Sequence, residues 1–206
     1  MNIILDPLPE SVEVDNQEYL VNWGFRTFIL IEICIFDKKL SDNERIQNAL
    51  ELFYLDVPND FNHAFEMMMW FYRGGKELKP EKKGSADPKR CYCFEQDAPY
   101  IYSAFRTQYG IDLQDLLSKD LHWWKFKALF ESLDDDLKMS KIMLYRVVDT
   151  AGMDKSQKKF YAVMKKLYAL ESETNANSKM ALAKRDADML IHINRRMKEV
   201  NSEKES

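Results

Sequence analysis

The sequence predicts a mainly α-helical protein, a multi-helix bundle with a short N-terminal β-hairpin and a long C-terminal helix. Apolar residues recur at helical spacing between capping residues along most of the chain. Near the N-terminus, two valines alternate with acids ahead of an Asp-Asn pair, which is typical of a tight hairpin. Residues 171–206 contain no aromatic residue, glycine or proline and have a heptad-like apolar spacing.

Composition and charge limit the class of protein. The chain has 206 residues, of which 46% are hydrophobic and 13% aromatic, so it can bury a core as one large domain or two small ones. Residues 1–72 carry 13 acids and 4 bases, whereas the formal charge of the whole chain is only -4. The remainder is therefore net positive. This division favours faces of opposite charge over a nucleic-acid-binding protein.

No targeting or membrane-spanning segment is expected. The N-terminal sequence MNIILDPLPE lacks the basic region of a signal peptide, and the apolar run GFRTFILIEICIF is interrupted by Arg26 and Glu32. The three cysteines, Cys34, Cys91 and Cys93, are odd in number. This number fits reduced thiols in a cytoplasm better than a disulfide framework.

The predicted N-terminal region, residues 1–75, begins with the hairpin. Residues 10–22 form it, because the valines alternate with acids and Asp15-Asn16 can adopt the positive φ angles of a two-residue turn. A first helix should follow, capped by Asn22 and ending near Phe36.

Two further helices complete this region. Ser41 and Glu44 form a capping box for the first of them. Its apolar face consists of Ile46, Ala49, Leu50 and Phe53. The next helix follows Pro58 and stops at Gly74-Gly75. Its inward residues are expected to be Phe61, Ala64, Phe65, Met68 and Tyr72.

A flexible linker at residues 76–90 is predicted to separate this region from a helical core at 91–170. The linker sequence KELKPEKKGSADPKR has two prolines, one glycine and a single large apolar residue. Asp97 should cap the first core helix, and Gly110 should end it. Further helices are expected at residues 113–117, 121–133, 134–149 and 154–170. The last helix carries an apolar stripe of Phe160, Met164, Leu167 and Tyr168.

The C-terminal segment, residues 171–206, is predicted to be an amphipathic helix. Its apolar stripe has the heptad spacing 3, 4, 3, 4, 3 and consists of Met180, Ala183, Ala187, Leu190, Asn194 and Met197. A lone helix of this kind is marginal in water, so it should need another surface to lie against. The stripe is therefore a candidate element for self-association or for binding a partner. The alternative is that it docks on the core of its own chain.

The aromatic sequence LHWWKFKALFESL has two apolar faces when it is placed on a helix. The larger face, which includes His122, Trp123 and Phe126, is expected to be core. Leu121 and Trp124 belong to the smaller face, which is either internal packing or a candidate partner surface. The two lysines within this sequence lie roughly 160° apart, so they do not form one basic track for a nucleic-acid strand.

No catalytic, cofactor-binding or metal-binding residue is predicted, and the protein is not expected to be an enzyme. The GGK sequence at residues 74–76 follows a helix and lacks the pattern of a phosphate-binding loop. Cys91 and Cys93, with His122 as a conceivable third ligand, fall short of a four-ligand zinc site. The acids at 134–136 are explained by a helix start. The eleven methionines can fill a core or line an adaptable binding surface.

Eight segments, taken in their order and spacing, resemble those of one family. They are NIILDPLPESVEV, FRTFIL, ALELFY, WFYRGGK, FEQDAPYIYSAFRTQYGIDLQD, LHWWKFKALFESL, YRVVD and KKLYAL. Together they resemble the bacteriophage gene-product-fifteen family, which is encoded by tailed phages and prophages of mostly Gram-positive bacteria. The resemblance covers about residues 1–170. Asn16 departs from it by standing where glycine is expected in the hairpin turn, and residues 171–206 do not align.

The resemblance implies a mainly helical protein without known catalytic residues. Its implied role is that of a tail assembly chaperone, which binds the tape-measure protein and keeps it soluble during assembly of a long non-contractile, siphovirus-type tail. The implied place of action is the host bacterial cytoplasm, and a second tail chaperone is a further candidate partner. The alternative is a structural tail adaptor that is retained in the virion. Neither nucleic acid nor a membrane is expected as a partner.

Overall fold

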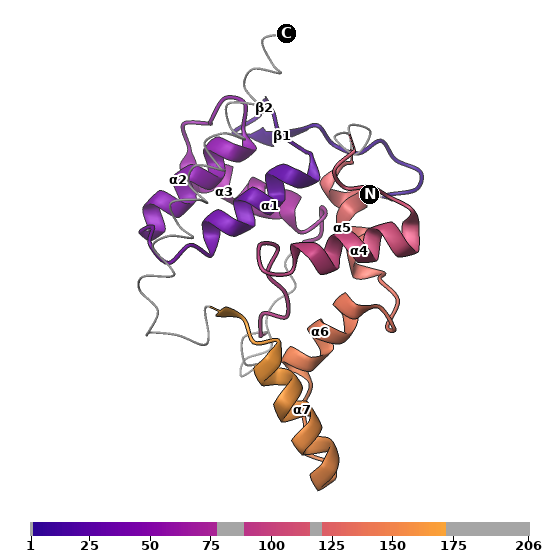
Figure 1. The fold of residues 1–206 in the computed structure, drawn as a ribbon. Helices are drawn as coiled ribbons and strands as arrows, with labels where there is room; N and C mark the ends of the chain where they lie inside the picture. The colour runs from indigo at the N-terminus through magenta and orange to yellow at the C-terminus, as the bar shows by residue number, and fades with distance from the viewer. Residues whose placement is uncertain (1, 78–88, 116–120, 172–206) are drawn as a thin grey trace. The chain divides into compact units, whose positions relative to one another are not determined.

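The computed structural model describes residues 2–77, 89–115 and 121–171, and Figure 1 shows the course of the chain. The described part is mostly helical, with seven helices and one two-stranded hairpin, as the sequence predicts. The strands are β1 Ser11–Val14 and β2 Gln17–Leu20. The helices are α1 Phe25–Ile35, α2 Asp42–Phe53, α3 Phe61–Tyr72, α4 Ala98–Tyr109, α5 Trp123–Glu131, α6 Lys138–Val147 and α7 Lys155–Leu167.

The chain divides into two units, Met1–Tyr168 and Ala169–Ser206, and residues 169–171 are the described part of the second. The predicted N-terminal region and nearly all of the predicted helical core therefore belong to the same unit. Residues 78–88, most of the predicted linker, lie outside the described residues. The same is true of residues 172–206, which hold the predicted C-terminal helix.

The hairpin has the predicted turn. Asp15 and Asn16 have φ angles of 52° and 60°, which place both residues in the left-handed region that a tight two-residue turn requires. Val12 and Val14 are buried on the inner face of the hairpin. The asparagine at position 16 satisfies the turn because its side chain tolerates this backbone conformation.

The start of α1 differs from the prediction. The helix begins after Gly24, so the predicted cap at Asn22 is wrong. The Asn22 side-chain amide donates to the Leu52 carbonyl oxygen at 2.8 Å, and its backbone N–H donates to the Phe53 carbonyl oxygen at 2.7 Å. Asn22 therefore joins the chain after the hairpin to the last turn of α2, where the helix leaves carbonyl oxygens unpaired.

The next two helices begin and end largely as predicted. Ser41 and Glu44 form both hydrogen bonds of the capping box of α2. In α3, Phe61 is exposed and Phe71 is fully buried, so the prediction that Phe61 points inward is wrong. Gly75 has a φ of 72°, and a Cβ atom there would lie 2.7 Å from the Trp124 ring. Glycine is therefore required both for the backbone conformation and for this close approach.

The second half of the unit contains two corrections. Residues 113–115 form a turn and not the start of a helix. The helix expected from the acids at 134–136 begins only at Lys138, without a side-chain cap. The start of α7 is as predicted, because Asp154 and Gln157 form a capping box. Gly110, with a φ of 68°, ends α4 as predicted.

One aromatic core joins the two halves of the unit. Phe126 of α5 stacks on Phe25 of α1 and on Phe105 of α4, each with ring centroids 4.9 Å apart. The Trp123 ring stacks on Phe28 of α1 at 5.0 Å. The larger apolar face predicted for the LHWWKFKALFESL sequence is therefore core.

Candidate partner-binding surface

The smaller apolar face of α5 is not an open surface. Trp124 is 4% exposed, and its indole N–H donates to the Phe71 carbonyl oxygen at 2.7 Å. Its ring also packs edge-to-face against Trp70. Leu121, at the start of this sequence, is partly buried against the core. The smaller face could have been either internal packing or a partner surface. In the structure, Trp124 is internal packing.

His122 has a structural role at the start of α5. Its Nδ1 atom accepts a hydrogen bond from the Trp124 backbone N–H at 3.0 Å, and its Nε2 atom lies 2.9 Å from the Pro9 carbonyl oxygen. These partners fit a neutral ring that carries its proton on Nε2. Burial lowers the pKa of His122, which favours the same neutral form. The side chain thus caps α5 and fixes the N-terminal segment.

A buried carboxylate lies between α1, α3 and the segment that leads to α4. Glu32 is 3% exposed and accepts hydrogen bonds from the hydroxyls of Tyr72 at 2.7 Å and Tyr92 at 3.3 Å. Arg90 approaches its other oxygen at 3.4 Å. Burial raises the pKa of Glu32, and the hydrogen bonds and Arg90 oppose this rise. The cluster joins residues 90–92 to the N-terminal helices.

The pH dependence of stability tests this cluster through the Glu32→Gln variant, which cannot ionise. Below the unfolded pKa, near 4.5, the Glu32 carboxyl is neutral in both the folded and the unfolded state. As pH rises through the raised folded pKa, the buried carboxyl must ionise at a cost that the unfolded chain does not have. The unfolding free energy of wild type, relative to the variant, should therefore fall as pH rises from 4.5 to neutral.

The measurement is urea unfolding of wild type and Glu32→Gln over this pH range. Replacement of the exposed Glu66 by glutamine is the control for the loss of one carboxylate. A difference between wild type and Glu32→Gln that rises with pH would contradict the assigned direction.

The most exposed apolar surface of a described helix lies on α7. This helix has no buried residue, and it carries an apolar row of Phe160, Val163 and Leu167, which are 49%, 54% and 64% exposed. The 3, 4 spacing places the three side chains on one face. Monomeric proteins rarely leave such rows open to water. We call these three residues the α7 row.

Lysines border the α7 row. The helix contains five lysines and no acid. Lys159 and Lys166 are exposed and lie one turn from Val163, so they border one edge of the row. Over residues 138–168, eight bases stand against two acids. The surface is therefore apolar at its centre and positively charged at its edge.

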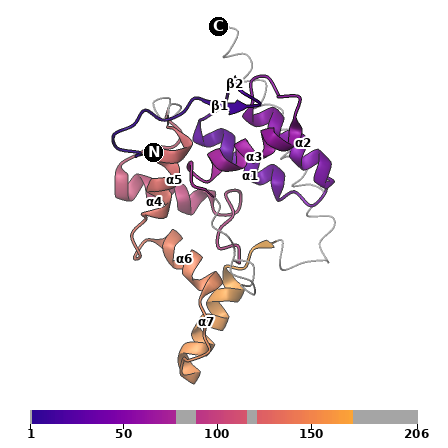
Figure 2. The same ribbon diagram turned by 180° about the vertical axis from the view of Figure 1, so that it is seen from behind.

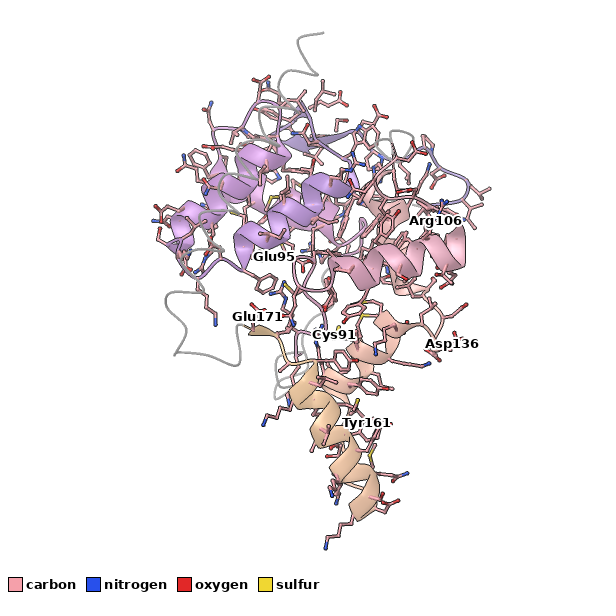
Figure 3. The ribbon with its side chains drawn as sticks, viewed as in Figure 1. Cys91, Glu95, Arg106, Asp136, Tyr161 and Glu171 are labelled. Carbon is pink, nitrogen blue, oxygen red and sulfur yellow. The ribbon has the colours of Figure 1, made fainter. Side chains whose placement is uncertain are left out.

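An adjacent face of α7 packs on α6 through aromatic rings, and Phe160 lies where this face meets the α7 row. Tyr145 of α6 stacks on Tyr168 at 5.9 Å and meets Phe160 and Tyr161 edge-to-face at 6.1 and 6.2 Å. Figure 3 labels Tyr161 on α7. The Lys165 ammonium donates to the Val148 carbonyl oxygen at 2.7 Å. These contacts determine which face of α7 is left for a partner.

A buried ion pair holds α6 on the rest of the unit. The Arg146 guanidinium donates to both carboxylate oxygens of Asp97, at 2.6 and 2.9 Å, and these side chains are 5% and 1% exposed. Arg146 also donates to the backbone carbonyl oxygens of Cys91 at 2.9 Å and Tyr168 at 2.6 Å. Asp97 is the N-cap residue of α4, as predicted, but its side chain makes no capping hydrogen bond to the helix. Its carboxylate is used for Arg146 and for the Cys93 N–H.

The comparison with known families decides the identity of the chain. Residues 4–170 match the family described as Bacteriophage Gp15 protein. The chain belongs to this bacteriophage family. Membership in the Gp15 family indicates a structural or assembly protein of a phage. No curated protein and no solved structure matches the chain significantly. In the described residues, no helix combines the length and the apolar composition that crossing a membrane requires.

The residues predicted to bind a partner lie in three different environments or regions of the chain. Trp124 lies in the core, and Leu121 lies partly buried beside it. The candidates Met180, Ala183, Ala187, Leu190 and Met197 lie outside the described residues. The α7 row was not predicted as a binding surface, because Phe160 and Leu167 were named only as part of the apolar stripe of this helix. The run of lysines without an acid was the signal that this helix lies at the surface.

Proposed function

We propose that this Gp15-family protein is a tail assembly chaperone. It binds the tape-measure protein and keeps it soluble while a long non-contractile tail assembles in the host cytoplasm. The observation that supports this proposal is the α7 row, an apolar surface whose three side chains are about half exposed or more. Family membership supports the coarser statement that the protein acts in phage structure or assembly.

The shape of the α7 row suits a helical partner. A tape-measure protein is a long, apolar helical filament that would aggregate if its surface were left open. Phe160, Val163 and Leu167 can pack against such a helix with side chains spaced three and four residues apart, as in other helix-in-groove complexes. The Tyr145 ring of α6 contacts Phe160 edge-to-face and so holds one end of the row in place. Binding of this kind requires no catalytic residue, and we propose no enzymatic activity.

Co-expression with the phage tape-measure protein tests the proposal. A Val163→Asp variant places a carboxylate in the centre of the row, and binding would have to take this charged group out of water. We expect affinity for the tape-measure protein to fall by at least about tenfold, with most of that protein becoming insoluble. The measurement is the fraction of tape-measure protein that stays in solution after lysis.

Ala162→Asp is the matched control. This residue is exposed and directly precedes Val163, but it points away from the row, so the same charge should leave solubility unchanged. If both variants keep the tape-measure protein soluble, the row does not bind it. Recovery of the protein in purified virions at a fixed copy number would instead support the alternative of a structural tail adaptor.

A further inference from the structure

We propose that, when no tape-measure protein is bound, the α7 row of one copy binds the acidic outer face of the N-terminal hairpin of a second copy. The two surfaces differ, so copies would join head to tail. This self-association uses the same row as the proposed chaperone function but is measured on the purified chain alone. Failure of one proposal therefore does not decide the other.

The acceptor surface combines exposed leucines with a pair of acids. In the hairpin register, Glu13 lies opposite Glu18 and Ser11 lies opposite Leu20, so these side chains share the outer face. Leu20 is 60% exposed. Leu55 is 47% exposed and donates its backbone N–H to the Leu20 carbonyl oxygen at 3.2 Å. The two leucines and the two glutamates therefore form one surface, which we call the acidic corner.

The two glutamates of the acidic corner face each other across the hairpin. Like charges directly opposite one another on neighbouring strands are destabilising, and this is the arrangement of Glu13 and Glu18. Within the described residues, neither glutamate forms an ion pair with a base. Residues 1–72 as a whole carry 13 acids and 4 bases. Lysines brought by a partner would relieve this local repulsion.

The α7 row has the complementary pattern. Its apolar centre matches Leu20 and Leu55, and Lys159 and Lys166 at its edge equal the two glutamates in number and are opposite to them in charge. Burying both apolar surfaces removes them from water, and the charges select the orientation. Each chain carries one row and one acidic corner, so a second copy of the chain is a partner that is always present with the row.

The α7 row and the acidic corner of the same molecule do not contact each other. Figures 1 and 2 both show the hairpin and α7 at opposite ends of the unit formed by residues 1–168. The row of one molecule must therefore meet the corner of another. Because the contact joins two different surfaces, it is heterologous and can continue from copy to copy.

Sedimentation of the purified full chain over a range of concentrations tests this inference. We expect concentration-dependent association that weakens at high salt, because exposed charges contribute to it. The Lys159→Glu/Lys166→Glu variant reverses the charge of the row, and the Glu13→Lys/Glu18→Lys variant reverses the charge of the corner. Each variant alone should associate at least roughly tenfold more weakly than wild type.

Mixing the two variants is the decisive measurement. The acidic row of one variant matches the basic corner of the other, and the unchanged surfaces also match, so association should return to near the wild-type level. Circular dichroism of each variant checks that the helices remain folded. A wild-type chain that stays monomeric, variants that associate like wild type, or a mixture that fails to associate would each overturn the inference.

Discussion

Replacement of Phe126 by alanine is expected to lower the free energy of unfolding by about 3 to 5 kcal/mol. Phe126 is fully buried and is stacked between Phe25 and Phe105, with Trp123 and Phe130 as further stacked neighbours. Truncation removes these contacts and leaves a cavity that rigid rings from three helices fill poorly. The variant should therefore lose a large part of the stability of a domain of this size.

Urea unfolding followed by tryptophan fluorescence measures this loss, because Trp123 and Trp124 lie in the same core. Lys125→Ala is the control on the same helix, since Lys125 is exposed and its replacement should change stability by less than about 0.5 kcal/mol. If Lys125→Ala proved as costly as Phe126→Ala, the assignment of this face as core would be wrong, and a role of α5 in binding would need to be considered again.

Replacement of Arg146 by alanine is expected to destabilise the attachment of α6 and α7 by about 3 to 5 kcal/mol. The change leaves the Asp97 carboxylate buried without its bidentate partner, and it removes donors from the Cys91 and Tyr168 carbonyl oxygens. A buried charge that has lost its partner costs more than the original pair contributed. The segment that carries the α7 row should therefore open more often.

Hydrogen exchange separates this local opening from global unfolding. In Arg146→Ala, backbone amides of α6 and α7 should exchange faster, whereas those of α5 should keep more of their protection. Arg106→Ala is the matched control, because Arg106 lies on α4 and donates to the Gly110 carbonyl oxygen at an exposed position (Figure 3). Equal exchange in both arginine variants would show that the buried pair does not hold α6 in place.

The two predictions concern the parts of the protein that the proposed function needs. The aromatic core around Phe126 fixes α5 against α1 and α4, and the Arg146 pair fixes α6 against α4. The α7 row is presented only if α6 stays attached, because α7 packs on α6. Loss of tape-measure binding in Arg146→Ala, with α5 still protected, would therefore be the functional counterpart of local opening.

Local sequence is sufficient to predict the elements that depend on residues within about four positions of one another. The hairpin turn at Asp15-Asn16 and the capping boxes at Ser41 and Asp154 are of this kind. In each case the donor, the acceptor and the required backbone angles are local, so the pattern alone is sufficient. The same holds for the aromatic face of α5, whose helical spacing identified it as core.

Contacts between distant parts of the chain govern which partner a polar side chain takes when it has more than one possible partner. Asn22 and Asp97 have the residue types of helix caps, but their partners come from Leu52 and Arg146, which lie 30 and 49 positions away. Leaving such buried partners unpaired would cost more than an exposed cap contributes, so the distant contact prevails. The face of α7 was decided in the same way. Its sequence offers one apolar stripe, and contact with Tyr145 determines which part packs and which part remains open for a partner.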